Sequence, residues 1–327
     1  MPLPPEFALI AKYFAPLADT PAALGLSDDA ALLAPPAGRQ LVVAADAMVA
    51  GVHFLDSDPA DTVARKLLRV NLSDLAAMAA EPLGFLLTIA LPKGFDSVWL
   101  RGFAAGLLED RRQFDVPLLG GDTVSTPGPA TLSLTILGHV EPGRALLRRG
   151  AAAGEVVWVS GTLGDAALGL RVLQGRLRGL SGRHAAYLSE RYRVPEPRLE
   201  LGRALAGIAT AALDVSDGLA QDIGHIARLA GCAAELEAPS LPRSEAAAAA
   251  IGLDASLGLL AVAGGDDYEL AFTAPPGHEA MVRGAAEAAG IGVAPVGRLL
   301  AGEAGEVRVL DDAGRPVRLE RTGWSHF

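Results

Sequence analysis

Apolar residues along this chain fall into two kinds of segment, short uninterrupted runs and longer stretches with helical spacing. Short runs predict strands, and the spaced stretches predict amphipathic helices. In the first part of the chain we expect strands at 41–45, 85–91, 116–119 and 131–140, and helices at 61–80 and 97–114. The first of these strands is expected to be buried and to end at Asp46, and Ser97 could cap the second helix.

The second part of the chain continues the alternation of strand and helix. We expect strands at 156–160, 211–213, 257–263, 269–273 and 293–298, and a helix at 217–230 that ends at Gly231. An apolar strand followed by Gly-Gly-Asp occurs twice, at 118–122 and at 261–266, and is a candidate repeat. The alternation predicts a mixed α/β architecture.

The chain has 327 residues, which is long for one domain and sufficient for two. The pattern changes after Gly143, so we expect one domain at 1–142 and a second at 143–327.

Charge and composition exclude several classes of partner. The formal net charge is −10 and only three lysines are present, so nucleic acid is not an expected partner. The longest apolar runs are far too short to span a bilayer, so we expect no membrane segment. Cys232 is the single cysteine, which excludes an internal disulfide and fits a reducing compartment. The N-terminus has no basic segment followed by an apolar one, so no signal peptide is expected and the cytoplasm is the expected location.

Aspartates recur at or just beyond the ends of apolar stretches. They are Asp28, Asp29, Asp46, Asp122, Asp214, Asp217, Asp266 and Asp267. Asp74 lies within a predicted helix, one turn after Asn71. A single Asp after a strand is usually a turn former or a helix cap. Six such places in one chain indicate a shared role, because gathered carboxylates repel one another unless cations lie between them. Magnesium prefers oxygen ligands and binds through a few carboxylates together with substrate phosphates, an arrangement that serves phosphoryl transfer.

Other motifs leave alternatives open. The turn at 161–164 could cradle a phosphate or be a plain strand–helix turn. His53 is either a loop histidine with internal partners or a substrate contact. The chain contains no Gly-x-x-x-x-Gly-Lys-Ser/Thr loop, no Gly-x-Gly-x-x-Gly after a strand and no protein-kinase motif set. No Ser, Cys or His stands in a recognisable nucleophile–base arrangement, so no covalent nucleophile is expected.

Several strings together resemble the thiamine-monophosphate kinases. Two are specific, Asn-Leu-Ser-Asp-Leu-Ala-Ala-Met at 71–78 and Asp-Val-Ser-Asp-Gly-Leu at 214–219. The other matching segments are 6–10, 28–31, 46–54, 120–123, 264–270 and the terminal Gly-Trp-Ser-His-Phe at 323–327. They cover essentially the whole chain in order.

This resemblance implies a two-domain α/β fold shared with aminoimidazole ribonucleotide synthetase and selenophosphate synthetase. It implies that the N-terminal domain binds metal and nucleotide and pairs in a homodimer, and that the C-terminal domain completes the nucleotide and substrate sites. It also implies the reaction, in which ATP phosphorylates thiamine monophosphate to thiamine diphosphate by direct in-line transfer with Mg²⁺. The metal ligands that it implies are Asp29, Asp46, Asp74, Asp122, Asp214 and Asp217. The implied ATP contacts are Gly121, Asp122, Arg148 and Ser216, and the implied thiamine contacts are His53, Asp266 and Trp324. Trp324 offers an aromatic face to a cationic ring, and its alternative role is a C-terminal anchor packed on the core.

Three departures from the family pattern affect this transfer of roles. Ala44 and Ala45 replace the hydroxyl residues usual before Asp46, so no hydroxyl can assist a metal there. The pair at 266–267 reads Asp-Asp where Glu-Asp is usual, which shortens the arm at the substrate contact. Arg149 follows Arg148 where a small residue is common, so either arginine could meet phosphate.

Two other functions compete with this interpretation. Another ATP-using member of the superfamily would act on an amide or a selenide. Selenide chemistry calls for a reactive Cys or selenocysteine near the N-terminus, and this chain has only Cys232. A calcium- or magnesium-stabilised binding module would explain the aspartates but not the terminal aromatic motif.

Overall fold

The computed structural model describes residues 5–93 and 95–325. Two compact units make up these residues. The first contains the chain up to Leu75 together with Ala80–Gly143, and the second contains Ala76–Ala79 together with the chain from Arg144 onward. The chain therefore enters the second unit briefly at 76–79 before it crosses between Gly143 and Arg144. Among the described residues, no helix combines the length and the apolar character needed to cross a bilayer.

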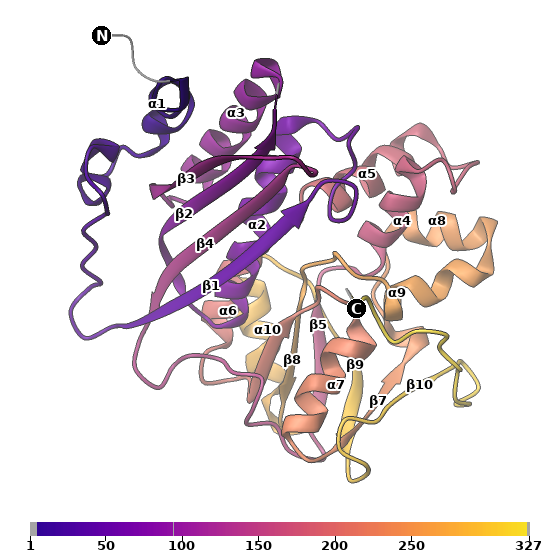
Figure 1. Ribbon diagram of the computed structural model, residues 1–327. Coiled ribbons are helices and arrows are strands. Elements are labelled where there is room, and N and C mark those ends of the chain that lie inside the picture. The colour runs from indigo at the N-terminus through magenta and orange to yellow at the C-terminus, as the bar shows by residue number, and fades with distance from the viewer. Residues whose placement is uncertain (1–4, 94, 326–327) are drawn as a thin grey trace. The chain divides into compact units, whose positions relative to one another are not determined.

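The first unit is built on a four-stranded sheet with the order β1-β4-β2-β3 (Figure 1). Its strands are β1 (Gln40–Val49), β2 (Glu81–Pro92), β3 (Leu118–Thr126) and β4 (Thr131–Val140). Its helices are α1 (Pro5–Leu9), α2 (Ala60–Ala77, whose last two residues belong to the second unit) and α3 (Ser97–Gln113). Short helical turns follow α1 at Ile10–Phe14, Ala15–Leu17 and Pro21–Leu26. Only β2 and β3 run parallel, and the other neighbouring strands are antiparallel.

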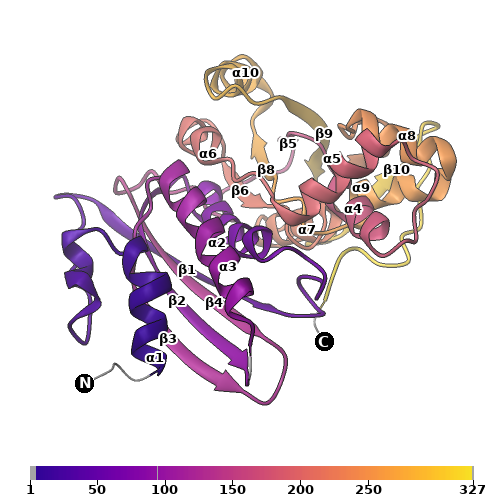
Figure 2. The ribbon, with the colours of Figure 1, turned by 90° about the horizontal axis from the view of Figure 1, so that it is seen from above.

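Alternation along β2 separates the two faces of this sheet. Phe85, Leu87 and Ile89 are buried, whereas Leu86 and Thr88 between them are exposed. Figures 1 and 2 show α2 and α3 together on one side of the sheet. The buried residues form the core beneath these helices, and we call the opposite side the outer face.

The second unit has a six-stranded sheet with the order β10-β7-β9-β5-β8-β6. Its strands are β5 (Val156–Ser160), β6 (Ala211–Asp214), β7 (Ala233–Glu237), β8 (Leu270–Ala274), β9 (Val293–Leu300) and β10 (Val307–Leu310). Its helices are α4 (Asp165–Leu173), α5 (Gly182–Arg193), α6 (Leu199–Leu205), α7 (Leu219–Leu229), α8 (Glu245–Leu253), α9 (Leu260–Ala263) and α10 (Glu279–Ala288). Short helical turns lie at Ala238–Ser240, Ala255–Leu259 and Pro276–His278.

Helices cover both faces of the six-stranded sheet. Val157 and Val159 of β5 pack in the cluster that contains α7, whereas Trp158 between them packs with α6 and α10. Consecutive strand residues point to opposite faces, so this alternation places α7 on one side and the other two helices on the second. A separate small cluster joins α4, α5 and α8. The prediction of a two-domain α/β fold is confirmed.

Several predicted elements match closely, namely α2, β2, α3, β4, β5 and β9. Several expectations are wrong. The strand at 41–45 is not buried and does not end at Asp46, because β1 is an edge strand that continues to Val49 and leaves Val43 60% exposed. The segment 257–263 is helical rather than a strand. The helix cap at α3 is Asp96 rather than Ser97, since Asp96 Oδ1 accepts a hydrogen bond from Val98 N at 2.8 Å.

The two Gly-Gly-Asp segments are not a structural repeat. At 120–122 the three residues continue strand β3, which the sequence analysis ended at Leu119. At 264–266 they follow the short helix α9. The same three-residue sequence therefore adopts two different backbone structures.

Candidate active site

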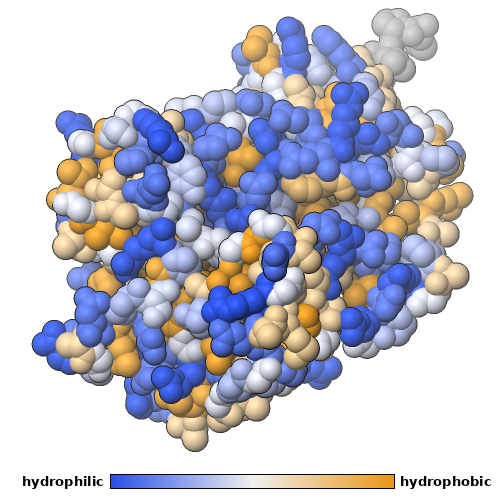
Figure 3. Space-filling view, turned by 180° about the vertical axis from the view of Figure 1, so that it is seen from behind, coloured by the Kyte–Doolittle hydropathy of each residue, from blue (hydrophilic) through white to orange (hydrophobic). Residues whose placement is uncertain are grey.

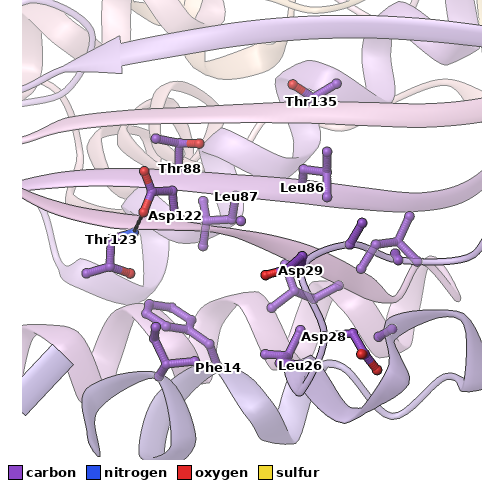
Figure 4. A pocket seen from close by; sticks show the side chains of 18 of the residues that line it. Phe14, Leu26, Asp28, Asp29, Leu86, Leu87, Thr88, Asp122, Thr123 and Thr135 are labelled. Atoms are coloured by element: carbon purple, nitrogen blue, oxygen red, sulfur yellow. Dashed lines mark hydrogen bonds between the residues drawn. The ribbon is translucent and has the colours of Figure 1, made fainter. Parts of the chain in front are cut away.

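A cavity of about 570 Å³ lies in the first unit, between the N-terminal segment and the outer face of the sheet. Phe14 and Leu26 form part of one wall, and residues of β2, β3 and β4 form the other (Figure 4). Three predicted site residues line it, Asp29, Gly121 and Asp122. The structure therefore brings together residues that are more than 90 positions apart in the sequence.

Asp122 stands on β3 directly opposite Thr88 of β2. Its Oδ1 accepts a hydrogen bond from Thr123 N at 2.8 Å, and the side chain is exposed to the cavity. Gly121 before it has a φ of 155°, and a Cβ there would overlap the carbonyl of Leu87. Glycine is thus required for β3 to pass this close to β2.

Asp46 belongs to the other face of the same sheet. The register pairs Ala47 with Ser133, Ser133 with Thr88 and Thr88 with Asp122, so these residues share the outer face. Asp46 directly precedes Ala47 on β1 and points to the opposite side of the sheet, because successive strand residues alternate.

On the inner side, the backbone of Asp46 is tied to α2. Asp46 N donates to Asn71 Oδ1 at 3.1 Å, and burial raises the pKa of the Asp46 carboxyl. Asp74 lies one helical turn beyond Asn71 on α2 and is half-buried. The predicted ligands of the first unit therefore form two sets, Asp29 and Asp122 on the outer face, and Asp46 and Asp74 on the α2 side.

His53 lies in the turn that follows β1. Its Nδ1 accepts a hydrogen bond from Val49 N at 3.0 Å, and its carbonyl oxygen accepts one from Lys66 Nζ at 3.1 Å. The ring therefore helps to hold the turn, as the loop-histidine interpretation expects, and Nδ1 is engaged within the protein.

The second unit brings four more predicted residues together at the end of β6. Asp214 is buried at the end of the strand, and the loop after it carries Ser216 and Asp217. The segment 264–268 runs alongside this loop, because Asp266 N donates to Ser216 O at 2.8 Å and Tyr268 N donates to Val215 O at 2.9 Å. Asp266 and Tyr268 have φ values of 68° and 51°, in the left-handed region. Asp enters this region more readily than most residues, which suits the Asp that replaces the usual Glu at 266.

Asp222 is a buried carboxyl behind this loop that the sequence analysis did not single out. Its Oδ2 accepts hydrogen bonds from Asp217 N at 3.2 Å and from Gly218 N at 3.0 Å. Burial raises the pKa of Asp222 to about 7, with further contributions from the charges of Asp214 and Asp217, while the two backbone hydrogen bonds act in the opposite direction. The available signal was its position in the first turn of α7 after Gly218.

Two more buried acids hold the segment 264–269, namely Asp267, which the sequence analysis noted among the aspartates, and Glu269, which it did not single out. Asp267 accepts hydrogen bonds from Gly164 N at 2.7 Å and Ala166 N at 3.3 Å, at the start of α4, and burial raises its pKa well above the usual value. The amide of Gly164 in the turn at 161–164 thus already binds a carboxyl of the chain. Glu269 is fully buried and pairs with Arg191 at 2.9 Å and Arg198 at 2.5 Å.

The remaining predicted residues of the second unit lie near α7. Arg148 and Arg149 are both exposed. Burial lowers the pKa of His225 on α7, and the nearby positive charge of Arg148 lowers it further. Trp324 is 48% exposed, and its backbone N donates to Asp217 O at 2.9 Å. The last two residues of the terminal motif, 326 and 327, lie outside the described residues.

The donor set fits magnesium in its chemistry. All six predicted ligands are carboxylates, and the effect of Asp214 and Asp217 on the pKa of Asp222 shows that negative charge gathers at the β6 loop. Within residues 5–93 and 95–325, no three His, Cys, Asp or Glu side chains converge into a metal site. Each location would thus supply one or two carboxylates, and substrate phosphate and water would supply the other oxygens, which is the usual way Mg²⁺ is held.

Comparison with known families covers most of the chain. Residues 27–140 match the AIR synthase related protein, N-terminal domain, and residues 152–310 match the AIR synthase related protein, C-terminal domain. The chain is 45% identical over 327 residues to the thiamine-monophosphate kinase of Caulobacter vibrioides, covering 99% of this chain and 91% of that protein.

Solved structures show the same similarity. The thiamine-monophosphate kinase of Stenotrophomonas maltophilia has a TM-score of 0.84 and 41% identity, with 96% of this chain and 98% of that chain covered. A structure of AaThiL complexed with AMPPCP and TMP has a TM-score of 0.79 and 28% identity, with 92% and 91% covered.

Proposed function

Because the chain belongs to the AIR synthase related proteins and, among them, to the thiamine-monophosphate kinases, we propose that it transfers the γ-phosphoryl group of ATP to thiamine monophosphate. The products are thiamine diphosphate and ADP. The observation that carries this conclusion is the 45% identity to a thiamine-monophosphate kinase along 99% of the chain. The nucleotide analogue and the TMP in the AaThiL structure support the same pair of substrates.

Magnesium is the proposed cofactor, held by the carboxylates of Asp29, Asp46, Asp74, Asp122, Asp214 and Asp217. When bound, it neutralises charge on the transferred phosphoryl group and on the phosphates beside it. Support for this assignment comes from the exposed Asp122 in the cavity and from the negative charge around the β6 loop.

Substrate contacts are proposed for two further sets of residues. Gly121, Arg148 and Ser216, with Asp122, contact the nucleotide, and His53, Asp266 and Trp324 contact the acceptor. The segment 264–268 orients Asp266 because Asp267 and Glu269, which follow it, are anchored to Gly164 and to two arginines. Asp222 fixes the loop of Asp217 through two backbone hydrogen bonds.

Direct transfer without a phosphoenzyme fits the chemistry of the acceptor. Its phosphate oxygen is already ionised near neutral pH, so no strong general base is required. Cys232 is buried, and the hydroxyls of Ser160 and Ser244 donate to the carboxylates of Glu269 and Asp165. These groups are thus committed to structure rather than to nucleophilic attack.

A homodimer is proposed through the outer face of the first sheet. Large apolar side chains of three strands are exposed on this face, and they are Leu41, Val43, Leu86 and Val124. An exposed apolar area of this kind is typical of a protein interface. The use of ATP and the single cysteine support the cytoplasm as the proposed location.

The test is incubation of the purified protein with ATP, Mg²⁺ and either thiamine monophosphate or thiamine, followed by phosphorus NMR of the products. We expect thiamine diphosphate and ADP from the monophosphate and no phosphorylated product from thiamine, which has no phosphate to share a cation with ATP. Turnover of thiamine at a comparable rate would contradict the assignment, and so would failure to phosphorylate the monophosphate.

A further inference from the structure

The side-chain amide of Gln221 joins two segments that are more than 100 residues apart in sequence. Gln221 is in the first turn of α7, and its Nε2 donates to Asp217 Oδ2 at 2.9 Å and to Trp324 O at 2.8 Å. A primary amide nitrogen carries two hydrogens, so it makes both bonds at once. One neutral group therefore contacts a proposed metal ligand and the backbone of a proposed acceptor contact.

Backbone hydrogen bonds hold the same C-terminal arm, which we define as residues 322–325. Gln221 N donates to Thr322 O at 3.1 Å, and Trp324 N donates to Asp217 O at 2.9 Å. One bond attaches the arm to Gln221 itself, and the other attaches it to Asp217, which the side-chain amide of Gln221 also contacts. The arm is thus fixed on α7 and on the loop of Asp217, rather than by a packed aromatic anchor, since Trp324 is 48% exposed.

Gly323 allows this close approach. A Cβ at this position would lie 2.7 Å from the Cβ of Gln221 and 2.8 Å from Asp217 O. Both neighbours belong to the start of α7 and the loop before it, so any larger side chain would push the arm away. The site therefore requires a residue without a side chain where the arm crosses Gln221.

We propose that Gln221 is a positioning residue that couples the C-terminal arm to the Asp217 loop, so that Trp324 is placed for the acceptor only while Asp217 is held in its present orientation. The coupling rests on the proposed function for what the two ends bind, but the attachment of the arm does not. Glutamine suits this role because it donates to Asp217 without adding charge, which leaves the carboxylate negative for a cation.

The attachment is tested by trypsin without any ligand. Arg321 is exposed and immediately precedes the arm, so cleavage after it removes the last six residues, which intact-mass spectrometry detects. We expect Gln221→Ala to speed this cleavage about tenfold, because the side-chain hydrogen bond to Trp324 O is lost together with the bond that holds the Asp217 side chain beside it. Gly323→Ala should have the same effect through steric exclusion. Gln174→Ala, at an exposed glutamine that ends α4, is the matched control and should cleave at the wild-type rate.

The coupling is tested by steady-state kinetics on the same variants. We expect Gln221→Ala to raise the KM for thiamine monophosphate about tenfold while changing the KM for ATP less than about twofold. Gln221→Glu, of nearly the same shape, should be at least as impaired because its carboxylate faces Asp217 and Trp324 O. Thermal unfolding confirms that each variant folds.

The outcomes separate the two proposals. Wild-type cleavage at Arg321 in both Gln221→Ala and Gly323→Ala would overturn the attachment. Faster cleavage with equal changes in both KM values would reduce Gln221 to a structural role and overturn the coupling. A wild-type enzyme that does not phosphorylate thiamine monophosphate would refute the proposed function and the coupling with it, while the trypsin result would still decide the attachment.

Discussion

Individual carboxylates in this protein differ in what surrounds them, and their substitution should differ accordingly. Asp122 is exposed to a cavity, and Asp267 is buried at the start of a helix. Substitution of Asp122 should change function without disturbing the packing of the fold. Substitution of Asp267 should change the stability of the protein.

Asp122→Asn should lower kcat at least about 100-fold while leaving the fold unchanged. The amide keeps an oxygen that can accept from Thr123 N, so the local structure persists. It loses the negative charge that would hold the magnesium ion on the transferred phosphoryl group, and this loss costs several kcal/mol of transition-state stabilisation. Steady-state kinetics and circular dichroism measure the two effects. Asp312→Asn, at an exposed loop position, is the control, and equal activity in the two variants would exclude Asp122 from the metal site.

Asp267 should make the protein less stable as pH rises. Burial raises its folded pKa well above the unfolded value of about 3.9, so the folded state keeps a proton that the unfolded state releases. The stabilisation is complete below about pH 4 and is lost as pH rises toward the folded pKa, with a slope of at most about 1.4 kcal/mol per pH unit. Urea unfolding of the wild type and of Asp267→Asn across pH 4–8 checks this expectation. The variant should show a shallower dependence, and an unchanged slope would contradict the buried-acid assignment.

At the scale of elements, buried ion pairs and the position of a strand in its sheet determine structure that the local sequence pattern does not predict. Glu269 directly precedes β8, and its carboxylate pairs with Arg191 of α5 and with Arg198 just before α6. A single carboxylate thus connects three segments of the second unit.

Glu269→Gln should lower the free energy of unfolding by about 3 kcal/mol. Removing the negative charge leaves two nearly buried guanidinium groups without their partner, which costs far more than loss of an exposed pair. Glu279→Gln is the matched control, because its pair with Arg283 is exposed and should contribute less than about 1 kcal/mol. Chemical denaturation of both variants measures the difference, and equal losses would show that the Glu269 cluster is not special.

Elements with a strong local period were predictable from the sequence, and those decided by neighbours were not. Helix α2 and strand β4 carry their own patterns, so their extents agree with expectation. The apolar run at 257–263 carries no period that separates strand from helix, and packing against α7 and α8 favours helical turns. For the candidate site, the motifs predicted the aspartates at 214, 217 and 266, and the fold places them around the end of β6. The motifs did not identify Gln221, Asp222 or Glu269, because these residues act through contacts that only the folded chain creates.

The whole molecule presents one apolar face in its first unit that the core does not use. On β1 this face includes Leu41 and Val43, which are 49% and 60% exposed. These side chains, together with Leu86 and Val124 on the same face, are the basis for the proposed homodimer.

Val43→Glu should convert the dimer to a monomer and reduce activity at the same time. The side chain is exposed in the single chain, so a charge there costs little in folding but much at an apolar interface. Leu229→Glu on α7 is the control, since Leu229 is equally exposed at 60% but lies outside the proposed interface. Analytical ultracentrifugation gives the oligomeric state, and a wild type that sediments as a monomer would refute the dimer.

The return of residues 76–79 to the second unit has a consequence for how the chain can be divided. Ala76, Ala77 and Ala79 belong to the apolar cluster that also contains Trp158 and Phe272. A gene split after codon 143 would leave these alanines on the wrong fragment, and the C-terminal fragment would fold with a gap in its core. Residues 76–79 are synthesised before the rest of the second unit, so the sequence from Arg144 onward cannot complete the core of that unit alone. The C-terminal fragment should therefore fold completely only when the N-terminal fragment is present to supply residues 76–79.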